Sequence, residues 1–415
     1  MKVIKFGIFG LYRGSSYYRA VLQNNGTIVA VCDKDEKRLA EAKEKISQDL
    51  ATYTDFEEFI NHPGLDAVFL CNYFDQHAPF AIRALNRGLH VLSECTAAST
   101  MAESVALVRA VEKTGKIFML AENYPYMKFN LEMKRLYESG NFGKCLYAEG
   151  EYNHPLSPLR REYIKSLRPH EKHWRNRTPR SYYITHSLGP LMHITGGNPK
   201  RVTALPVYSP ESHDPLFGCG VADRAAIITC LNDDNSVYRV VGCSAFGGHG
   251  NYYRICGTKG QMENLKDGSG RVAYRYNDWE IPEGDEEGRC YEPEWHDSDE
   301  ELIKMSGHGG GDFYVIRNFF DGIRNGKKPF FDVYRSTTMA SVAILAHRSI
   351  LNGGEPFDIP DFRLERDRQA YENDTLSPFY GINGEEPTLP CCSHAEHNPD
   401  KALTDDYNRL LEEIF

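Results

Sequence analysis

The first third of the chain alternates short apolar runs with amphipathic stretches of helical period. The apolar runs, each expected to form a strand, are residues 3–9, 27–32, 67–71, 90–93 and 117–121. Helical patterns lie between them, for example at 78–86 and 101–113, and a glycine follows each of these two helices where a C-cap favours one. Strands that alternate with helices predict a parallel sheet wound with helices, so residues 1–123 are expected to form an α/β domain.

The pattern changes after Glu122. A helix is expected at 130–139, and extended segments then follow one another without helices between them, at 145–152, 201–207, 225–231, 237–244, 252–256 and 271–276. Such a succession predicts a second domain of α+β type over residues 124–360, built on an open, largely antiparallel sheet. Residues 283–301 are acidic with Gly and Pro and predict a solvated loop, whereas 312–324 and 336–351 have helical patterns. The polar tail, 361–415, is expected to pack back on the body.

Composition narrows the class of protein. A chain of 415 residues with 41% hydrophobic and 26% charged residues is long enough for two cores and is ordinary for a globular protein. The net charge of -10 and the lack of a basic stripe argue against a nucleic-acid partner. No run approaches ~18 apolar residues, and the N-terminus lacks signal-peptide features, so we expect no membrane role and a cytoplasmic location. The 11 cysteines, many of them in predicted strands, are typical of reduced, buried thiols.

The first predicted strand runs into a glycine-containing turn, residues 10–15, before a helix. Glycines at such a turn let the backbone approach a pyrophosphate, so Gly10, Tyr12, Arg13, Gly14 and Ser15 are candidate cofactor-binding residues. The turn departs from the strict fingerprint because Tyr12 stands where glycine is expected.

Asp33 ends the second strand, about 20 positions further on, where an acid accepts hydrogen bonds from the adenosine ribose. Its charge favours NAD over NADP, although Lys34 and Arg38 lie nearby; the alternative is a turn or N-cap aspartate.

The segment 71–77, followed by 84–94, resembles the glucose-fructose oxidoreductase, inositol dehydrogenase and rhizopine-catabolism (Gfo/Idh/MocA) family over nearly the whole chain. The resemblance implies an N-terminal Rossmann domain that binds NAD, with Asn72, His77 and Glu94 at the cofactor site. That family usually continues Glu-Lys-Pro, and its lysine polarises or deprotonates the reacting hydroxyl. Here Glu94 is followed by Cys95 and Thr96, and a thiol lacks the cationic charge that is useful beside an alkoxide.

Five further motifs resemble the NAD-dependent glycoside hydrolases of family 109, which share this fold and also lack that lysine. In order they are residues 120–123, 151–154, 183–190, 257–260 and 307–312. This resemblance implies that Glu122, Tyr152, His154, Tyr183 and His186 lie around the nicotinamide and the sugar. His308, in the last motif, and Trp174, near a basic stretch, are candidate substrate residues; the alternatives are a histidine that fits a tight loop and a tryptophan that packs a lid.

These residues suggest a redox-assisted cleavage. An imidazole titrates near neutral pH, so His186 is the better base for a sugar hydroxyl as hydride leaves carbon 3, and Tyr152 could then remove the acidified proton of carbon 2. Elimination at carbon 1, addition of water and return of the hydride would give net hydrolysis. The alternatives are an NAD-dependent sugar or glycoside 3-dehydrogenase that releases a keto product, and a non-catalytic ligand-binding protein on the same fold.

The remaining expectations concern metals and partners. Cys391, Cys392, His394 and His397 have metal-like chemistry, but they lack the second half of a structural zinc site, so no metal is predicted. The partner is expected to be a small-molecule sugar or glycoside. An open antiparallel sheet needs its outer face covered, so a homodimer or homotetramer is expected.

Overall fold

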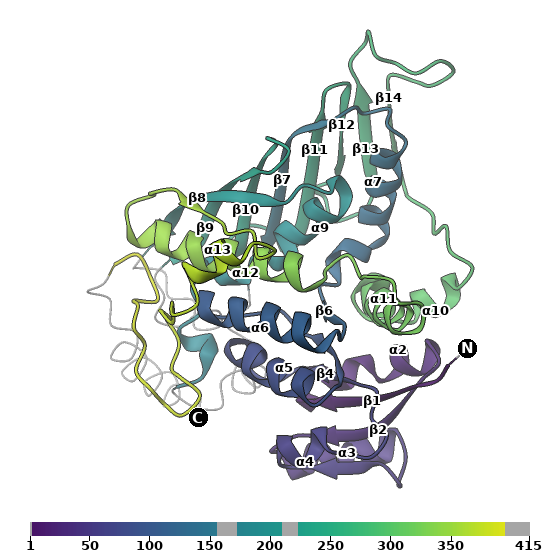
Figure 1. Cartoon of the computed structure of the whole chain (residues 1–415). Helices are drawn as coiled ribbons and strands as arrows, with labels where there is room; N and C mark the ends of the chain where they lie inside the picture. Colours follow the sequence, from purple (N-terminus) through teal and green to yellow (C-terminus); the bar gives the residue numbers. More distant parts are fainter. Residues whose placement is uncertain (1, 156–171, 210–222, 395–415) are drawn as a thin grey trace, which may run out of the picture. The chain divides into compact units, whose positions relative to one another are not determined.

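The computed structural model describes residues 2–155, 172–209 and 223–394 (Figure 1). Its contacts divide the chain into two compact units, and the segments of the two units alternate along the sequence. Unit 1 comprises residues 1–135, 292–340 and 361–373, and unit 2 comprises 136–291, 341–360 and 374–415. The sequence predicted domains that are consecutive stretches of chain, with boundaries at 123 and 360, and those boundaries stay a prediction.

Unit 1 is built on a six-stranded sheet in the order β3-β2-β1-β4-β5-β6, with every pair parallel. Every residue of β4, an inner strand of this sheet, is buried. Residues 67–70 are therefore continuously apolar rather than alternating. The fold class predicted from the sequence is thereby confirmed for the first unit. The strands are β1 Ile4–Phe9, β2 Gly26–Cys32, β3 Ala51–Tyr53, β4 Ala67–Leu70, β5 His90–Ser93 and β6 Phe118–Leu120.

Helices of unit 1 begin and end where the local sequence dictates. Helix α6 starts at a capping box between Thr100 and Glu103 and ends at Gly115, whose φ of 64° is left-handed. The helices are α1 Leu11–Gly14, α2 Tyr18–Gln23, α3 Glu36–Lys45, α4 Phe56–Ile60, α5 His77–Asn86, α6 Met101–Thr114, α10 Glu300–Lys304, α11 Gly311–Asn325 and α13 Glu365–Gln369. Helices α7 Lys128–Glu138 and α12 Val333–Leu351 have residues in both units.

The core of unit 1 joins segments that are far apart in the sequence. Phe6 of β1 packs against Phe69 of β4 and against Phe319 and Phe320 of α11, with ring centroids 5.2–6.3 Å apart. Helix α11 therefore belongs to the hydrophobic core of the Rossmann sheet, although it lies late in the chain. This packing brings the start of α11 to the same unit as the nucleotide loop.

Unit 2 is built on a nine-stranded sheet in the order β14-β13-β12-β11-β7-β10-β9-β8-β15 (Figure 1). All described pairs are antiparallel except β7 with β10, which is parallel. The predicted open, largely antiparallel sheet is confirmed. Its strands are β7 Cys145–Asn153, β8 Pro199–Tyr208, β9 Asp223–Asn232, β10 Val237–Ser244, β11 Gly250–Gly257, β12 Gly260–Asn264, β13 Val272–Tyr276, β14 Gly288–Tyr291 and β15 Phe357–Asp358.

Helix α9 Thr185–Thr195 packs closely on this sheet. A Cβ at Gly150 of β7 would lie 2.0 Å from the carbonyl oxygen of Ser187, so only glycine permits the approach. Two short 3-10 turns precede the helix, η4 Trp174–Asn176 and η5 Arg180–Tyr183. The close approach brings the first turn of α9 to the end of β7, where the candidate catalytic residues lie.

Part of one sequence expectation is wrong. Residues 283–301 were expected to be a solvated loop, but they include strand β14, which pairs with β13, and the start of α10. Strand β14 is mostly exposed at the edge of the sheet, so it lacks the apolar alternation by which a strand is recognised. Strands β3, β12 and β15 were also missed, because each is only two to five residues long.

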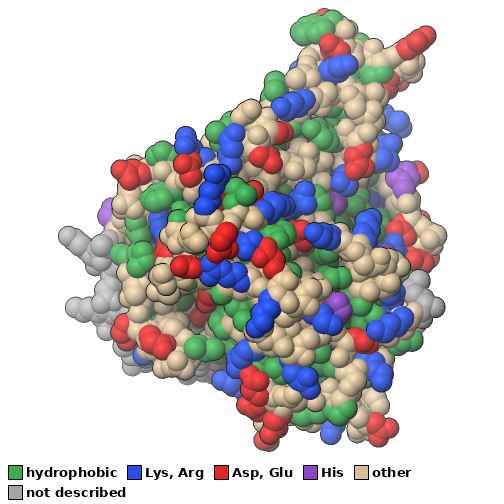
Figure 2. All heavy atoms as spheres, in the orientation of Figure 1, with side chains coloured by type: hydrophobic (Ala, Val, Ile, Leu, Met, Phe, Trp, Pro, Cys, Tyr) green, Lys and Arg blue, Asp and Glu red, His purple; other side chains and the backbone are tan. Residues whose placement is uncertain are grey.

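The described part of the tail packs on both units. Arg368 pairs with Glu112 within unit 1, and in unit 2 Ser393 donates to Asp223 at 2.6 Å while His347 contacts the carbonyl oxygen of Pro390 at 2.7 Å. Acidic and basic side chains intermingle on the face drawn in Figure 2. None of the helices in the described ranges combines the length and the apolarity that crossing a membrane requires.

Candidate active site

The nucleotide turn of unit 1 is shaped by a glycine that no other residue could replace. Gly10 follows β1 with φ 90°, and a Cβ there would lie 2.4 Å from the carbonyl oxygen of Cys71 and 2.7 Å from the backbone nitrogen of Asn72. Helix α1 starts at the next residue and continues through the 3-10 turn η1 Ser15–Tyr17 into α2. A bare backbone at the end of the first strand, leading into a helix, is the geometry that accommodates a pyrophosphate.

Asp33 lies directly after β2 and is held by this turn. Its Oδ2 accepts a hydrogen bond from the backbone N–H of Leu11 at 2.7 Å, and its Oδ1 accepts one from Asp35 at 3.0 Å. The aspartate is therefore fixed beside the glycine turn, as expected for a ribose-binding acid. Tyr12 is 47% exposed, and the guanidinium of Arg38 lies 4.9 Å from its ring centroid. The ring at position 12 thus points outward, so the turn tolerates tyrosine where the fingerprint has glycine.

His77 connects two loops at the strand ends. It is 2% exposed, and its Nδ1 lies 2.8 Å from the carbonyl oxygen of Thr96 while its Nε2 lies 3.3 Å from that of Asn72. Burial lowers the pKa of this imidazole, so the ring is neutral and donates to one carbonyl at a time. The structure thus gives His77 a part in holding the loops that contain Asn72 and Glu94.

Arg13 and Glu94 contact each other. The Nε of Arg13 lies 2.8 Å from Oε1 of Glu94, which also accepts from the Tyr17 hydroxyl at 3.3 Å. A second guanidinium nitrogen of Arg13 lies 3.3 Å from Asp312. Arg13, predicted to bind the cofactor, is therefore engaged by two carboxylates of its own unit.

Cys95 occupies the position at which the family resemblance expects lysine. Its Sγ lies 3.3 Å from Oε2 of Glu122, and Oε1 of that carboxylate accepts from the backbone N–H of Tyr124 at 3.1 Å. Glu122 is completely buried just after β6. The peptide bond between Cys95 and Thr96 is cis. A neutral donor therefore faces Glu122 here.

His308 lies at the start of the 3-10 turn η6 His308–Gly310, which leads into α11. Its Nδ1 lies 3.0 Å from Oδ2 of Asp312, a carboxylate that is 1% exposed, while 40% of the His308 side chain is exposed. Asp312 also accepts from Nδ2 of Asn123 at 2.8 Å. Burial alone would raise the pKa of Asp312, but the hydrogen bond from His308 and the charge of Arg13 outweigh it and lower that pKa to about 2. The carboxylate is therefore ionised whenever the protein is folded at working pH.

A second group of candidate residues lies together in unit 2. Tyr152 of β7 contacts three other rings, with centroids 5.0 Å from His186, 5.4 Å from His154 and 6.1 Å from Tyr183. Tyr183 and His186 are themselves 5.5 Å apart, and the Tyr253 hydroxyl donates to the carbonyl oxygen of His186 at 2.5 Å. The structure thus brings all four residues that the sequence named as catalytic into one cluster.

Sequence reasoning missed one member of this neighbourhood. His249 stacks on His154 with centroids 4.7 Å apart, and its Nδ1 donates to the carbonyl oxygen of Asn153 at 3.2 Å. It lies in a loop with three glycines, of which Gly247 has φ 83°. A histidine flanked by glycines, as at His308, was the signal that could have identified it.

Trp174 lies near the cluster, and one face of its ring is covered by a neighbouring side chain. The guanidinium of Arg175 covers its ring at 4.3 Å, and a small hollow is lined by Trp174, Tyr183 and Arg180 among others. Trp174 and one residue of the cluster, Tyr183, both line this hollow, and the substrate role of Trp174 stays a prediction.

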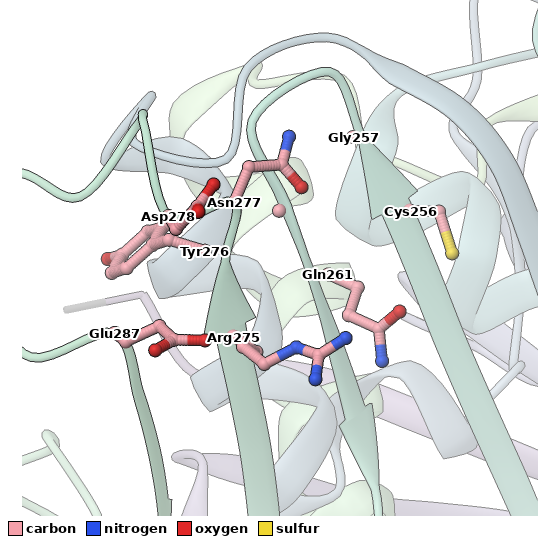
Figure 3. A pocket seen from close by; sticks show the side chains of 9 residues that line it. Cys256, Gly257, Gln261, Arg275, Tyr276, Asn277, Asp278 and Glu287 are labelled. Atoms are coloured by element: carbon pink, nitrogen blue, oxygen red, sulfur yellow. The ribbon is translucent and has the colours of Figure 1, made fainter.

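A larger hollow, of about 500 Å³, lies elsewhere on the sheet (Figure 3). It is lined by polar side chains of β12, β13 and their neighbours, including Gln261, Arg275 and Glu287, and by none of the predicted site residues. Among the described residues no group of three or more His, Cys, Asp or Glu side chains is placed to hold a metal ion. His397 lies outside the described residues.

Comparison with known proteins agrees with this geometry. Residues 4–122 match the family described as "Oxidoreductase family, NAD-binding Rossmann fold" (Gfo/Idh/MocA). This match makes the first part of the chain an NAD-binding Rossmann domain of the oxidoreductase class. Residues 228–367 match "Glycosyl hydrolase 109, C-terminal domain". The chain therefore combines a domain that matches the Gfo/Idh/MocA family with a region that matches the glycosyl hydrolase 109 C-terminal domain, and the resemblance found in the sequence is confirmed.

Relatives span most of the chain. A glycosyl hydrolase family 109 protein of Shewanella pealeana is 26% identical over 400 residues, covering 87% of this chain and 86% of its own. An alpha-N-acetylgalactosaminidase of Tannerella forsythia is 25% identical over 414 residues, covering 87% and 86%. Among solved structures, levoglucosan dehydrogenase in complex with NADH and L-sorbose superposes with a TM-score of 0.73 at 18% identity, covering 87% of this chain and 100% of its own. Along most of its length the chain is therefore similar to proteins whose names are those of enzymes acting on sugars or glycosides.

Proposed function

We propose that this protein is a glycosidase that oxidises sugar carbon 3 transiently and regenerates its NAD within each turnover. The observation that supports this function best is the cluster in which the rings of Tyr183, His186 and His154 surround the phenol ring of Tyr152. The cluster thus combines two phenols and two imidazoles. Proton transfer at two adjacent sugar carbons needs two bases, and the cluster offers both.

The glycine turn and Asp33 would hold NAD, which when bound would supply hydride acceptance from carbon 3 and hydride return. His186 takes the proton of the carbon 3 hydroxyl, since imidazole is the base suited to neutral pH. The imidazolium that forms packs edge-on against Tyr152, at 5.0 Å, and stabilises a phenolate there. Tyr152 then removes the proton from carbon 2, which the neighbouring ketone has made acidic.

His308 is proposed to protonate the oxygen that leaves carbon 1. Its ring is held by a buried, ionised carboxylate at 3.0 Å, and its exposed edge is available to a ligand. Water then adds to carbon 1 and gives a proton back to His308, carbon 2 regains its proton from Tyr152, and His186 returns the proton to the carbon 3 oxygen. The net reaction is hydrolysis with no change in the redox state of NAD.

The test is release of p-nitrophenol from p-nitrophenyl glycosides by purified protein without added cofactor. A redox-neutral hydrolase turns over repeatedly on the NAD it retains. Stoichiometric NADH absorbance that requires added NAD would instead identify a sugar or glycoside 3-dehydrogenase. Failure to bind any nicotinamide nucleotide would leave a ligand-binding protein on the same fold.

A substrate deuterated at carbon 2 tests the second base. Wild-type protein should exchange this deuterium with solvent, whereas Tyr152→Phe should lose the exchange and about 100-fold or more in turnover. Tyr147→Phe is the matched control, because Tyr147 lies on the same strand and its hydroxyl donates to Glu149. Exchange that persists in Tyr152→Phe would contradict the role of Tyr152. Cytoplasmic residence and assembly as a homodimer or homotetramer remain predictions from the sequence.

A further inference from the structure

His308 belongs to a network with two carboxylates, Asp312 and Glu94, and with Arg13 and Asn123, and the proposed reaction does not yet explain this network. Asp312 is 1% exposed, yet it accepts from His308, Asn123 and Arg13 at distances of 3.0, 2.8 and 3.3 Å. A buried carboxylate with three donors is costly to assemble and strongly directional. Most of its donors come from elements far apart in the sequence, so the arrangement depends on the tertiary fold.

The position of Asp312 on the chain favours contact with His308. The two residues are four positions apart, and Gly309 and Gly310 between them have φ of 57° and 93°. His308 itself has φ 51°, which is left-handed for a residue with a side chain. These backbone conformations turn the ring of His308 back over the first turn of α11, where Asp312 meets Nδ1.

We propose that Asp312 is a positioning residue that fixes the tautomer and orientation of His308, with the proton on Nδ1 and with Nε2 as the nitrogen that exchanges protons with the ligand. This inference rests on the proposed function for the identity of the ligand. A carboxylate only accepts, so the ring nitrogen facing it must be the protonated one. The second nitrogen then takes up and delivers the proton at the exposed edge of the ring.

Arg13 links this dyad to the nucleotide turn. Its guanidinium is shared between Glu94 at 2.8 Å and Asp312 at 3.3 Å, and its backbone belongs to α1, three positions after Gly10. Any movement of this turn displaces the cation that faces Asp312. The geometry therefore makes the orientation of His308 sensitive to whether the nucleotide turn is ordered.

Nitrogen-15 NMR of histidine-labelled protein measures the tautomer directly, at a pH where the ring holds one proton, with His308 assigned from the spectrum of His308→Gln. We expect the Nδ1–H tautomer in the wild type. In Asp312→Asn the amide can donate, so the Nε2–H form should appear. An Nε2–H tautomer in the wild type, or no change of tautomer in Asp312→Asn, would overturn the inference. The wild-type measurement does not require the variant to fold.

Kinetics give the second readout. Asp312→Asn should slow cleavage of an alkyl glycoside, which needs a proton donor, about 100-fold, and cleavage of a p-nitrophenyl glycoside less than tenfold. Asp297→Asn is the matched control, because Asp297 accepts from Arg317 at 2.5 Å and from Tyr314 at 2.9 Å in the same unit. Equal losses on both substrates would contradict the positioning role. A wild type that cleaves neither glycoside would count against the proposed function, while the tautomer would still decide the inference.

Discussion

The thiol of Cys95 and the buried carboxylate of Glu122 lie 3.3 Å apart, at the place where the Gfo/Idh/MocA pattern has a lysine. A thiol is a weak, neutral donor, so Glu122 has no cation from this position. A lysine there would supply positive charge to a developing alkoxide. In the proposed function this absence of a cation leaves the sugar hydroxyl proton to another group, for which we propose His186.

Replacing the thiol tests this account. Cys95→Lys places an ammonium beside Glu122, so we expect oxidation of free sugar with added NAD, followed as NADH absorbance, to rise about tenfold. Cys95→Leu is the control, since it removes the thiol without adding charge. Equal NADH formation by the two variants would show that charge at this position is irrelevant.

Asp33 is expected to select NAD. In Asp33→Asn the amide oxygen still accepts from Leu11, but the negative charge is lost, so the Kd for NAD should rise about tenfold and discrimination against NADP should shrink. Calorimetric titration of cofactor-free protein measures both constants. Asp35→Asn, at the N-cap of α3, changes the same charge two residues away and should leave both constants unchanged.

A comparison of Gly10 with Gly88 separates the cost of backbone strain from the cost of crowding a side chain. Both have φ 90°, but a Cβ at Gly88 would lie 4.0 Å from Cε of Lys116, whereas at Gly10 it would lie 2.4 Å from a carbonyl oxygen. We expect Gly88→Ala to lower the free energy of unfolding by about 1–2 kcal/mol, and Gly10→Ala by about 3 kcal/mol or more with loss of NAD binding. Urea unfolding and cofactor titration provide the measurement, and equal costs would contradict the close approach.

Asp75 gives a prediction about pH. Burial raises its pKa to about 7, and the nearby charge of Glu103 adds to the shift. An acid whose pKa is higher in the folded state stabilises the fold fully below its unfolded pKa, near 4, and loses that contribution as pH rises toward 7. Asp75→Asn should therefore match the wild type near pH 4 and exceed it by about 4 kcal/mol at pH 8. Asp49→Asn, at an exposed site, should show no such trend in urea unfolding. A difference that is constant across this range would contradict the burial of a titrating Asp75.

The sequence by itself predicted the two kinds of sheet and named the candidate site residues. Apolar runs predicted the buried parallel strands, a succession of extended segments without helices predicted the strands of unit 2, and ordered motifs singled out Tyr152, Tyr183 and His186 as candidates. These features are local, because strand burial and helix capping depend on residues a few positions apart. The short edge strands were missed for the same reason, since an exposed edge has no apolar period.

Only the tertiary structure decided which distant residues meet. Helix α11 packs on the Rossmann sheet through Phe319 and Phe320, and this packing delivers Asp312 to Arg13, 299 positions away. His249 reaches His154 because β11 pairs antiparallel with β7. Contacts of this kind follow from the burial of apolar surface by whole elements, and no local pattern of residues specifies the partner across such a separation.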